Sequence, residues 1–127
     1  MDLNQVTLPS RDVARGALFY RKLGFNQIVE DLPKYARFEA PTGSATLSLH
    51  HAESFGPSGV IVYLECTDVD ERVRVLSALG IEFDAPPVDR PWLWREAMLR
   101  DPDGNLLCLF HAGENRRHPP WRLPGDV

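Results

Sequence analysis

The sequence predicts an α+β fold made of two copies of one β-α-β-β-β module. The first observation is an internal repeat, in which Asp12-Val13 recurs 56 positions later as Asp68-Val69. The second is that strand-like and helix-like segments follow one another in the same order in both copies. Repetition at this length indicates a pseudo-symmetric pair of supersecondary units. The expected boundaries are residues 3–52 for module one, 53–59 for a linker, 60–111 for module two and 112–127 for a tail.

Module one is expected to begin with a strand over residues 3–8 and a helix over residues 11–23. Pro9 interrupts the strand, and the Ser10 hydroxyl is placed to cap the first helical turn. Gly24 is the expected end of the helix, because glycine enters the left-handed conformation without strain. Three strands should then follow, over residues 26–31, 35–40 and 45–50.

Module two repeats this order. It is expected to contain a strand over residues 60–66, Thr67 as a helix cap and a helix over residues 70–79. The segment Asp101-Pro102-Asp103-Gly104 predicts a tight turn, because proline presets one backbone dihedral and glycine supplies the positive one. The remaining strands are expected near residues 82–84, 95–100 and 105–110.

Composition excludes several classes of function. The 127 residues suffice for one domain with a real core, and 43% of them are hydrophobic. Fourteen basic against eighteen acidic residues give a net charge of −4, so no nucleic-acid partner is expected. Neither a membrane partner nor a signal peptide is expected, because the apolar runs are short and the first residues lack a signal pattern. Two cysteines are too few for a disulfide framework, which favours a reducing, cytoplasmic location.

Two segments carry a resemblance to a known family. Residues 11–25 contain Asp-Val, Phe-Tyr and Leu-Gly-Phe after a short strand, and residues 101–105 read Asp-Pro-Asp-Gly-Asn before the last strand. Together they resemble the vicinal oxygen chelate superfamily, which includes glyoxalase I, bleomycin-resistance proteins, fosfomycin-inactivating enzymes and extradiol dioxygenases. The resemblance covers residues 3–111 and implies a curled mixed sheet around a cleft, usually completed by a homodimer. It leaves function open, because one fold hosts several chemistries.

In metal-dependent members of that family, four strand positions hold a divalent ion as His or Gln, Glu, His and Glu. The resemblance places these positions at Gln5, Ser48, Ile61 and Cys108. Hard catalytic metals need oxygen and imidazole ligands, usually with a carboxylate. This set offers neither imidazole nor carboxylate, so no cofactor is predicted. In the alternative, a divalent metal is bound by Gln5, His50 and either Glu65 or Cys108. Strand alternation turns His50 to the same side as Ser48, so it could replace the missing ligand there.

Strand alternation also predicts which side chains line a cleft for a small-molecule ligand. Glu65 is the candidate general base if enclosure raises its pKa, against the simpler interpretation of a solvated strand-end glutamate; no other residue is assigned to catalysis. Trp92 and Trp94 could stack on a planar ligand or a cation, or fill a dimer interface. Arg37 could bind an anion or pair with Glu39. The expected ligand-binding residues are Gln5, Thr7, Ser48, His50, Tyr63, Glu65, Trp92, Trp94, Cys108 and Phe110.

Three functional hypotheses follow. The leading one is a homodimeric, metal-independent protein of the glyoxalase/bleomycin-resistance type that binds an organic ligand in the inter-module or dimer cleft. The alternative is a divalent-metal-dependent lyase, isomerase or dioxygenase of the same superfamily. The third is an interaction module that uses Trp92, Trp94 and Trp121. The tail segment Pro119-Pro120-Trp121 is expected to pack on the body of the protein or on a partner subunit.

Overall fold

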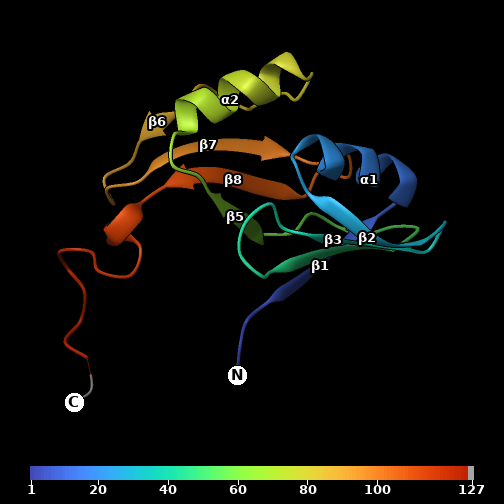
Figure 1. Cartoon of the computed structure of the whole chain (residues 1–127), viewed down its shortest axis with the longest axis horizontal. Helices are drawn as coiled ribbons and strands as arrows, with labels where there is room; N and C mark the ends of the chain where they lie inside the picture. Colours follow the sequence, from blue (N-terminus) through green and yellow to red (C-terminus); the bar gives the residue numbers. More distant parts are fainter. Residues whose placement is uncertain (126–127) are drawn as a thin grey trace. The chain divides into compact units, whose positions relative to one another are not determined.

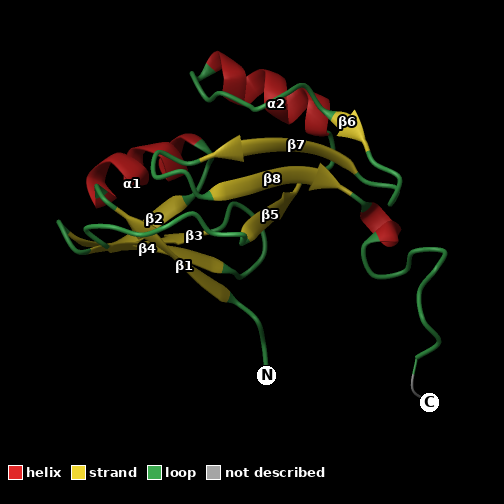
Figure 2. Ribbon diagram, turned by 180° about the vertical axis from the view of Figure 1, so that it is seen from behind, coloured by secondary structure: helices red, strands yellow, loops and turns green. Residues whose placement is uncertain are grey.

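A computed structural model of the chain describes residues 1–125 and divides them into two compact units. Unit 1 consists of residues 1–60 and 100–105, and unit 2 consists of residues 61–99 and the chain from Leu106 onward. Each unit contains one α-helix and one four-stranded mixed sheet (Figure 1, Figure 2). The α+β class and the β-α-β-β-β order are therefore confirmed. The last two residues of the predicted tail, 126 and 127, lie outside the described residues.

Unit 1 is built on a sheet with the strand order β1-β4-β3-β2. The first strand runs parallel to the fourth, and the other neighbouring pairs are antiparallel. The first strand and the helix begin two residues later than predicted, whereas the strand predicted at residues 26–31 has both expected ends. The elements are β1 (Gln5–Ser10), α1 (Val13–Lys22), β2 (Asn26–Asp31), β3 (Tyr35–Glu39) and β4 (Thr46–His51).

Unit 2 has the corresponding strand order β5-β8-β7-β6. The strand predicted near residues 82–84 is reduced to a single bridge between Phe83 and Leu99, and a two-residue strand forms further along the chain. Pro86 and Pro87 lie between these positions, and proline has no backbone N–H for a sheet ladder. The elements are β5 (Ile61–Glu65), α2 (Val69–Ala78), β6 (Val88–Asp89), β7 (Arg95–Arg100), β8 (Leu106–His111) and the 3₁₀ turn η1 (Gly113–Asn115).

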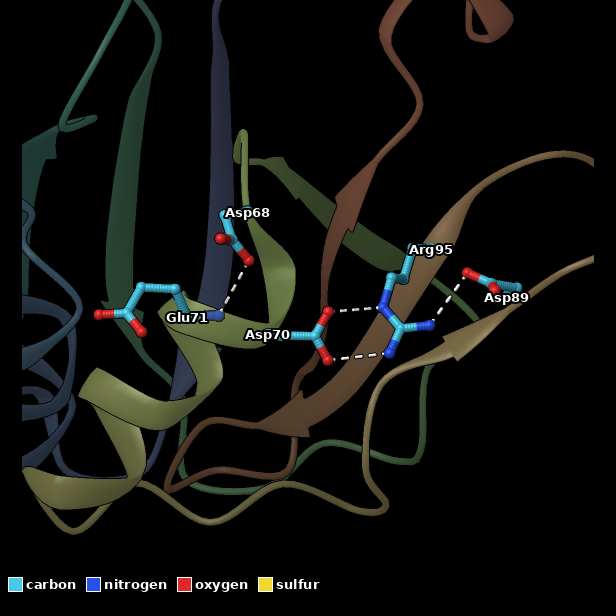
Figure 3. A network of polar contacts seen from close by, with 5 residues as sticks. All are labelled: Asp68, Asp70, Glu71, Asp89 and Arg95. Atoms are coloured by element: carbon cyan, nitrogen blue, oxygen red, sulfur yellow. Dashed lines mark hydrogen bonds and ion pairs between the residues drawn. The ribbon is translucent and has the colours of Figure 1, made fainter.

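Aspartates cap both helices. Asp12 and Asp68 each accept a hydrogen bond from the backbone amide three positions later, at 3.1 and 3.0 Å (the second is drawn in Figure 3). The predicted caps Ser10 and Thr67 are therefore wrong. Ser10 instead ends β1 and is fully buried, and its hydroxyl has no hydrogen-bond partner in residues 1–125. A carboxylate at the cap also interacts favourably with the positive end of the helix dipole.

The side chains of β7 alternate between the two faces of its sheet. Arg95 donates two hydrogen bonds to Asp70 of α2, at 2.7 and 2.8 Å, and one to Asp89 of β6, at 3.0 Å (Figure 3). Arg95 therefore lies on the helix side of the sheet. Its chain neighbours Trp94 and Glu96 point to the opposite face, because successive strand residues alternate.

The helix-facing sides of the two sheets form the cores. Gly16 allows α1 to approach β4 closely, since an added Cβ would lie 2.6 Å from the Leu49 side chain. The fully buried Tyr20 donates a hydrogen bond to Asp101 at 2.8 Å, which ties the loop of residues 100–105 to unit 1. Burial and the Asp101 carboxylate raise the pKa of Tyr20 far above its usual value. No helix within residues 1–125 has the length and apolar character needed to cross a membrane.

Candidate functional site

The face of the unit 2 sheet opposite α2 is aromatic. Trp94 stacks on Phe110, with 4.5 Å between the ring centroids and an interplanar angle of 22°. Tyr63 meets both rings edge-on, at 5.8 and 5.6 Å. Tyr63 and Phe110 come from the neighbouring strands β5 and β8, and Trp94 directly precedes β7. Phe110 and Trp94 belong to a hydrophobic cluster whose other members are Cys108, Ala112, Ile61 and Met98.

Glu96 places a carboxylate in this aromatic face. Its side chain is only 8% exposed, and it accepts a hydrogen bond from the Trp92 indole N–H at 2.8 Å. The Arg90 guanidinium lies 3.5 Å from the second carboxylate oxygen and 5.8 Å from the Trp92 ring centroid. A carboxylate withdrawn from water is costly unless it is paired or hydrogen-bonded, and both partners here come from one short segment.

The segment that carries these partners is a strained turn. Leu93, between the two tryptophans, has a φ of 68°, in the left-handed region that side chains other than glycine seldom adopt. Two backbone hydrogen bonds close the turn, from Arg90 N to Trp94 O at 2.8 Å and from Leu93 N to Arg90 O at 3.0 Å. Strain of this kind concentrates at functional sites, where it fixes side chains in a required arrangement. Here the strained residue, Leu93, lies between Trp92 and Trp94, and both tryptophans line one pocket of unit 2.

A pocket of about 580 Å³ opens on this face of unit 2. Its volume falls in the range of roughly 300–1,000 Å³ that is common for small-molecule sites. The tail contributes Pro119 and Trp121 to its lining. The other lining residues are Ile61, Tyr63, Arg90, Trp92, Trp94, Glu96, Met98, Asn115 and Arg116.

Glu65 has a different environment from the one expected of a general base. Its carboxylate accepts hydrogen bonds from the backbone amides of Ala112, at 2.7 Å, and Gly113, at 2.9 Å. Arg116 lies 3.7 Å from its other oxygen. Partial desolvation opposes the effect, but the two amides and Arg116 lower the pKa of Glu65. The expectation of a raised pKa is therefore wrong, because these donors stabilise the charged form.

The corresponding face of unit 1 is polar. The Gln5 carbonyl accepts a hydrogen bond from Thr46 at 2.8 Å, and the Tyr35 hydroxyl bonds to Ser48 and accepts from Arg37 at 2.9 Å. Partial burial opposes it, but these hydrogen bonds lower the pKa of Tyr35. Thr7 and His50 are exposed on the same face of the sheet.

The suggested pairing of Arg37 with Glu39 does not occur. Arg37 interacts with Tyr35, through both its Nε donor and its position over the ring, 5.4 Å from the centroid. Glu39 instead accepts a hydrogen bond from Asn26 at 2.9 Å. Tyr35 lies two residues from Arg37 on the same strand, and Asn26 is the neighbour of Glu39 across the β2–β3 pair; the sequence pattern alone revealed neither contact.

The family positions for a divalent metal do not fit such an ion. Ser48 is fully buried and already bonded to Tyr35, and Ile61 has no donor atom. Burial raises the pKa of the Cys108 thiol to about 12, with a further contribution from Glu96, so it stays protonated at neutral pH. Among residues 1–125, no cluster of three or more His, Cys, Asp or Glu side chains is arranged to hold a metal.

The structure brings some of the predicted site residues together within unit 2. Tyr63, Trp92 and Trp94 line its pocket. The Phe110 ring contacts Tyr63 and Trp94, and Cys108 belongs to the buried cluster against which Trp94 packs. Sequence reasoning missed Arg90, Glu96 and Met98, which also line the pocket. A signal for the last two was present, since the strand at residues 95–100 was predicted and alternation from Trp94 turns Glu96 and Met98 to its side. Nothing in the local pattern pointed to Arg90.

Comparisons with known proteins agree with this architecture. The model of the Glyoxalase/Bleomycin resistance protein/Dioxygenase superfamily matches residues 2–109. A glyoxalase/bleomycin resistance protein/dioxygenase from Nocardioides is 27% identical, with a TM-score of 0.75 over 100% of this chain and 89% of that one. A bleomycin-binding protein complexed with bleomycin is 28% identical, with a TM-score of 0.71 over 87% and 98%. A bleomycin resistance determinant encoded on the transposon Tn5 is 29% identical, with a TM-score of 0.72 over 87% and 98%. A comparison with curated proteins finds no significant match.

Proposed function

We infer a ligand-binding function for this chain, which belongs to the glyoxalase/bleomycin resistance protein/dioxygenase superfamily. In this proposal the protein binds a small organic molecule in the pocket of unit 2, without a resident metal ion. The observation that carries the proposal is Glu96, a carboxylate only 8% exposed in a pocket whose other walls include Tyr63, Trp92 and Trp94.

The ligand that suits this pocket best is an organic cation with a planar group. A charged hydrogen bond between a ligand N–H and the Glu96 carboxylate is stronger than a neutral one. The faces of Trp92 and Trp94 attract cations and stack on planar rings. Arg90 already occupies this environment as an internal cation, and its side chain is 40% exposed. A ligand amidinium or ammonium would take its place while Arg90 turns towards solvent.

Relatives support a binding role. The bleomycin-binding protein, whose structure is a complex with bleomycin, is 28% identical to this chain and covers 87% of it. The Tn5 bleomycin resistance determinant is 29% identical and also covers 87%. A divalent-metal lyase, isomerase or dioxygenase is less well supported, because the family's ligand positions are Gln5, Ser48, Ile61 and Cys108 here. Gln5, His50 and either Glu65 or Cys108 remain the candidate ligands of that alternative. The Glu65 carboxylate is bonded to the backbone amides of Ala112 and Gly113, and the raised pKa of Cys108 keeps its thiol protonated at neutral pH.

The test is calorimetric titration of the metal-free protein with benzamidinium and with benzamide, its neutral analogue of nearly the same shape. We expect benzamidinium to bind more tightly by roughly tenfold or more, the usual margin of a charged over a neutral hydrogen bond. Glu96→Gln should abolish that preference, because it keeps the acceptor oxygen and removes the charge. Glu82→Gln is the matched control, since Glu82 is an exposed acid of the same unit.

Two results would contradict the proposal. One is equal affinity for the two compounds, or no binding of either, in the unsubstituted protein. The other is binding that appears only after manganese or zinc is added and disappears in Gln5→Ala or His50→Ala, which would favour the enzyme hypothesis.

The proposal includes a cytoplasmic homodimer. Cys66 and Cys108 are free thiols, as is usual in reducing compartments. Tyr63, Trp92 and Trp121 are each about half exposed, and aromatic side chains of this kind are enriched at subunit interfaces. Light scattering on the purified protein tests the oligomeric state, and a monomer at micromolar concentration would exclude the dimer.

A further inference from the structure

The tail forms one wall of the unit 2 pocket. Asn115, Arg116, Pro119 and Trp121 all contribute to its lining, although they follow the last strand of the sheet. Trp121 remains 57% exposed beside the pocket. An aromatic side chain in this position gains contact area when a ligand enters, so the placement of the tail matters for binding.

The start of the tail is held by Glu65. Its carboxylate bonds to the backbone amides of Ala112 and Gly113, the residues at which the chain leaves β8 and enters η1, and Arg116 lies 3.7 Å away. Backbone amides bonded to a carboxylate form charge-assisted hydrogen bonds, which are stronger than those between neutral groups. Glu65 itself is on β5, so the contact joins positions that are 47 and 48 residues apart in the sequence.

The tail is also braced along its length, which allows the effect of Glu65 to reach Trp121. His118 N donates to Glu114 O at 2.7 Å, and Arg122 N donates to Pro119 O at 2.9 Å. The Arg122 guanidinium donates to Arg117 O at 2.9 Å. These bonds span the segment from η1 to the residue after Trp121.

We propose that Glu65 is a positioning residue for ligand binding, which holds the start of the tail so that Trp121 completes the pocket wall. This inference rests on the proposed function of that pocket. Glu65 does not touch the ligand in this account, and it acts only through the tail. Glu65 is thereby assigned a structural role in place of the general-base role that its strand position predicted.

The experiment combines a double-mutant cycle with limited proteolysis. We expect Glu65→Ala and Trp121→Ala each to weaken benzamidinium binding by roughly 3- to 10-fold, the size of an aromatic contact. The double variant should bind no more weakly than Trp121→Ala alone, because non-additivity is the signature of two residues acting through one contact. Glu114→Ala, which removes an exposed carboxylate from the same segment, should bind as the unsubstituted protein does.

Trypsin provides a readout that needs no ligand. Arg116 and Arg117 are exposed residues of the tail, and Glu65→Ala should speed cleavage after them at least several-fold, whereas Glu114→Ala should not. Unchanged cleavage, additive binding losses or unchanged affinity in Glu65→Ala would each overturn the positioning role. If the unsubstituted protein binds no benzamidinium at all, the proposed function fails, and the failure is recognised without reference to the variants.

Discussion

Replacing Arg90, the cation beside Glu96 in the unit 2 pocket, should tighten the binding of benzamidinium and lower the free energy of unfolding. Arg90 lies 3.5 Å from the Glu96 carboxylate and is 40% exposed, so its pairing with Glu96 is screened and worth about 0–1 kcal/mol. A ligand cation must displace this guanidinium before it can bind to Glu96. Arg90→Gln removes the competitor, and the affinity for benzamidinium should rise by up to about fivefold, the equivalent of that free energy.

The same substitution should lower the free energy of unfolding in the absence of ligand. Glu96 is 8% exposed and would lose the Arg90 guanidinium while keeping the hydrogen bond from the Trp92 indole, so we expect a loss of about 1 kcal/mol in urea denaturation. Calorimetry on Arg90→Gln, with benzamide as the neutral comparison, measures the gain in affinity. Weaker binding of benzamidinium, or an equal gain for benzamide, would refute the competition between Arg90 and the ligand. A gain that persists in the Arg90→Gln/Glu96→Gln double variant would refute it as well.

Three further predictions concern stability and reactivity. Tyr20→Phe should lower the free energy of unfolding by about 1–2 kcal/mol, because Asp101 loses a buried donor at 2.8 Å, and urea denaturation measures this change. Gly16→Ala should cost about 1–3 kcal/mol, since its Cβ would lie 2.6 Å from a β4 side chain, whereas Gly59→Ala, with no atom within 4 Å of its Cβ, should change little. The pKa of Cys108 is raised to about 12 from a usual value near 9, so the thiol should react with Ellman's reagent at pH 8 only after unfolding. The contribution of the protonated Cys108 thiol to the free energy of unfolding is present below pH 9 and is lost as the pH rises towards 12. Over that range the unfolded state releases a proton that the native state retains.

Local patterns in the sequence were sufficient for most of the secondary structure. The strand at residues 26–31 and the strand at residues 95–100 have the predicted ends, because alternation and turn residues act over a few positions. Gly24 and Gly80 follow the helices with φ of 101° and 91°, as the helix-stop argument requires. The helix caps were misplaced, since Asp12 and Asp68 compete with neighbouring hydroxyl residues for the same amides and the outcome depends on where the strand ends.

The candidate site was predictable only in part. Alternation predicted that Tyr63 and Phe110 share one face of the sheet, where their rings contact each other. Trp94 was expected only as an aromatic residue before a strand, and its ring contacts both of them. The role of Glu96 could have been found by the same rule. The lowered pKa of Glu65 could not, because its hydrogen-bond donors are amides that arrive from the far end of the chain.

The sequence by itself determined the two β-α-β-β-β modules and their helix-facing cores, because each depends on residue types at short or repeated spacing. Only the tertiary structure decided that Arg90 pairs with Glu96 beside Trp92 and that Glu65 accepts hydrogen bonds from the Ala112 and Gly113 amides at the start of the tail. The physical reason is that charge pairing and burial depend on which distant segments meet in space, and no local periodicity encodes those meetings.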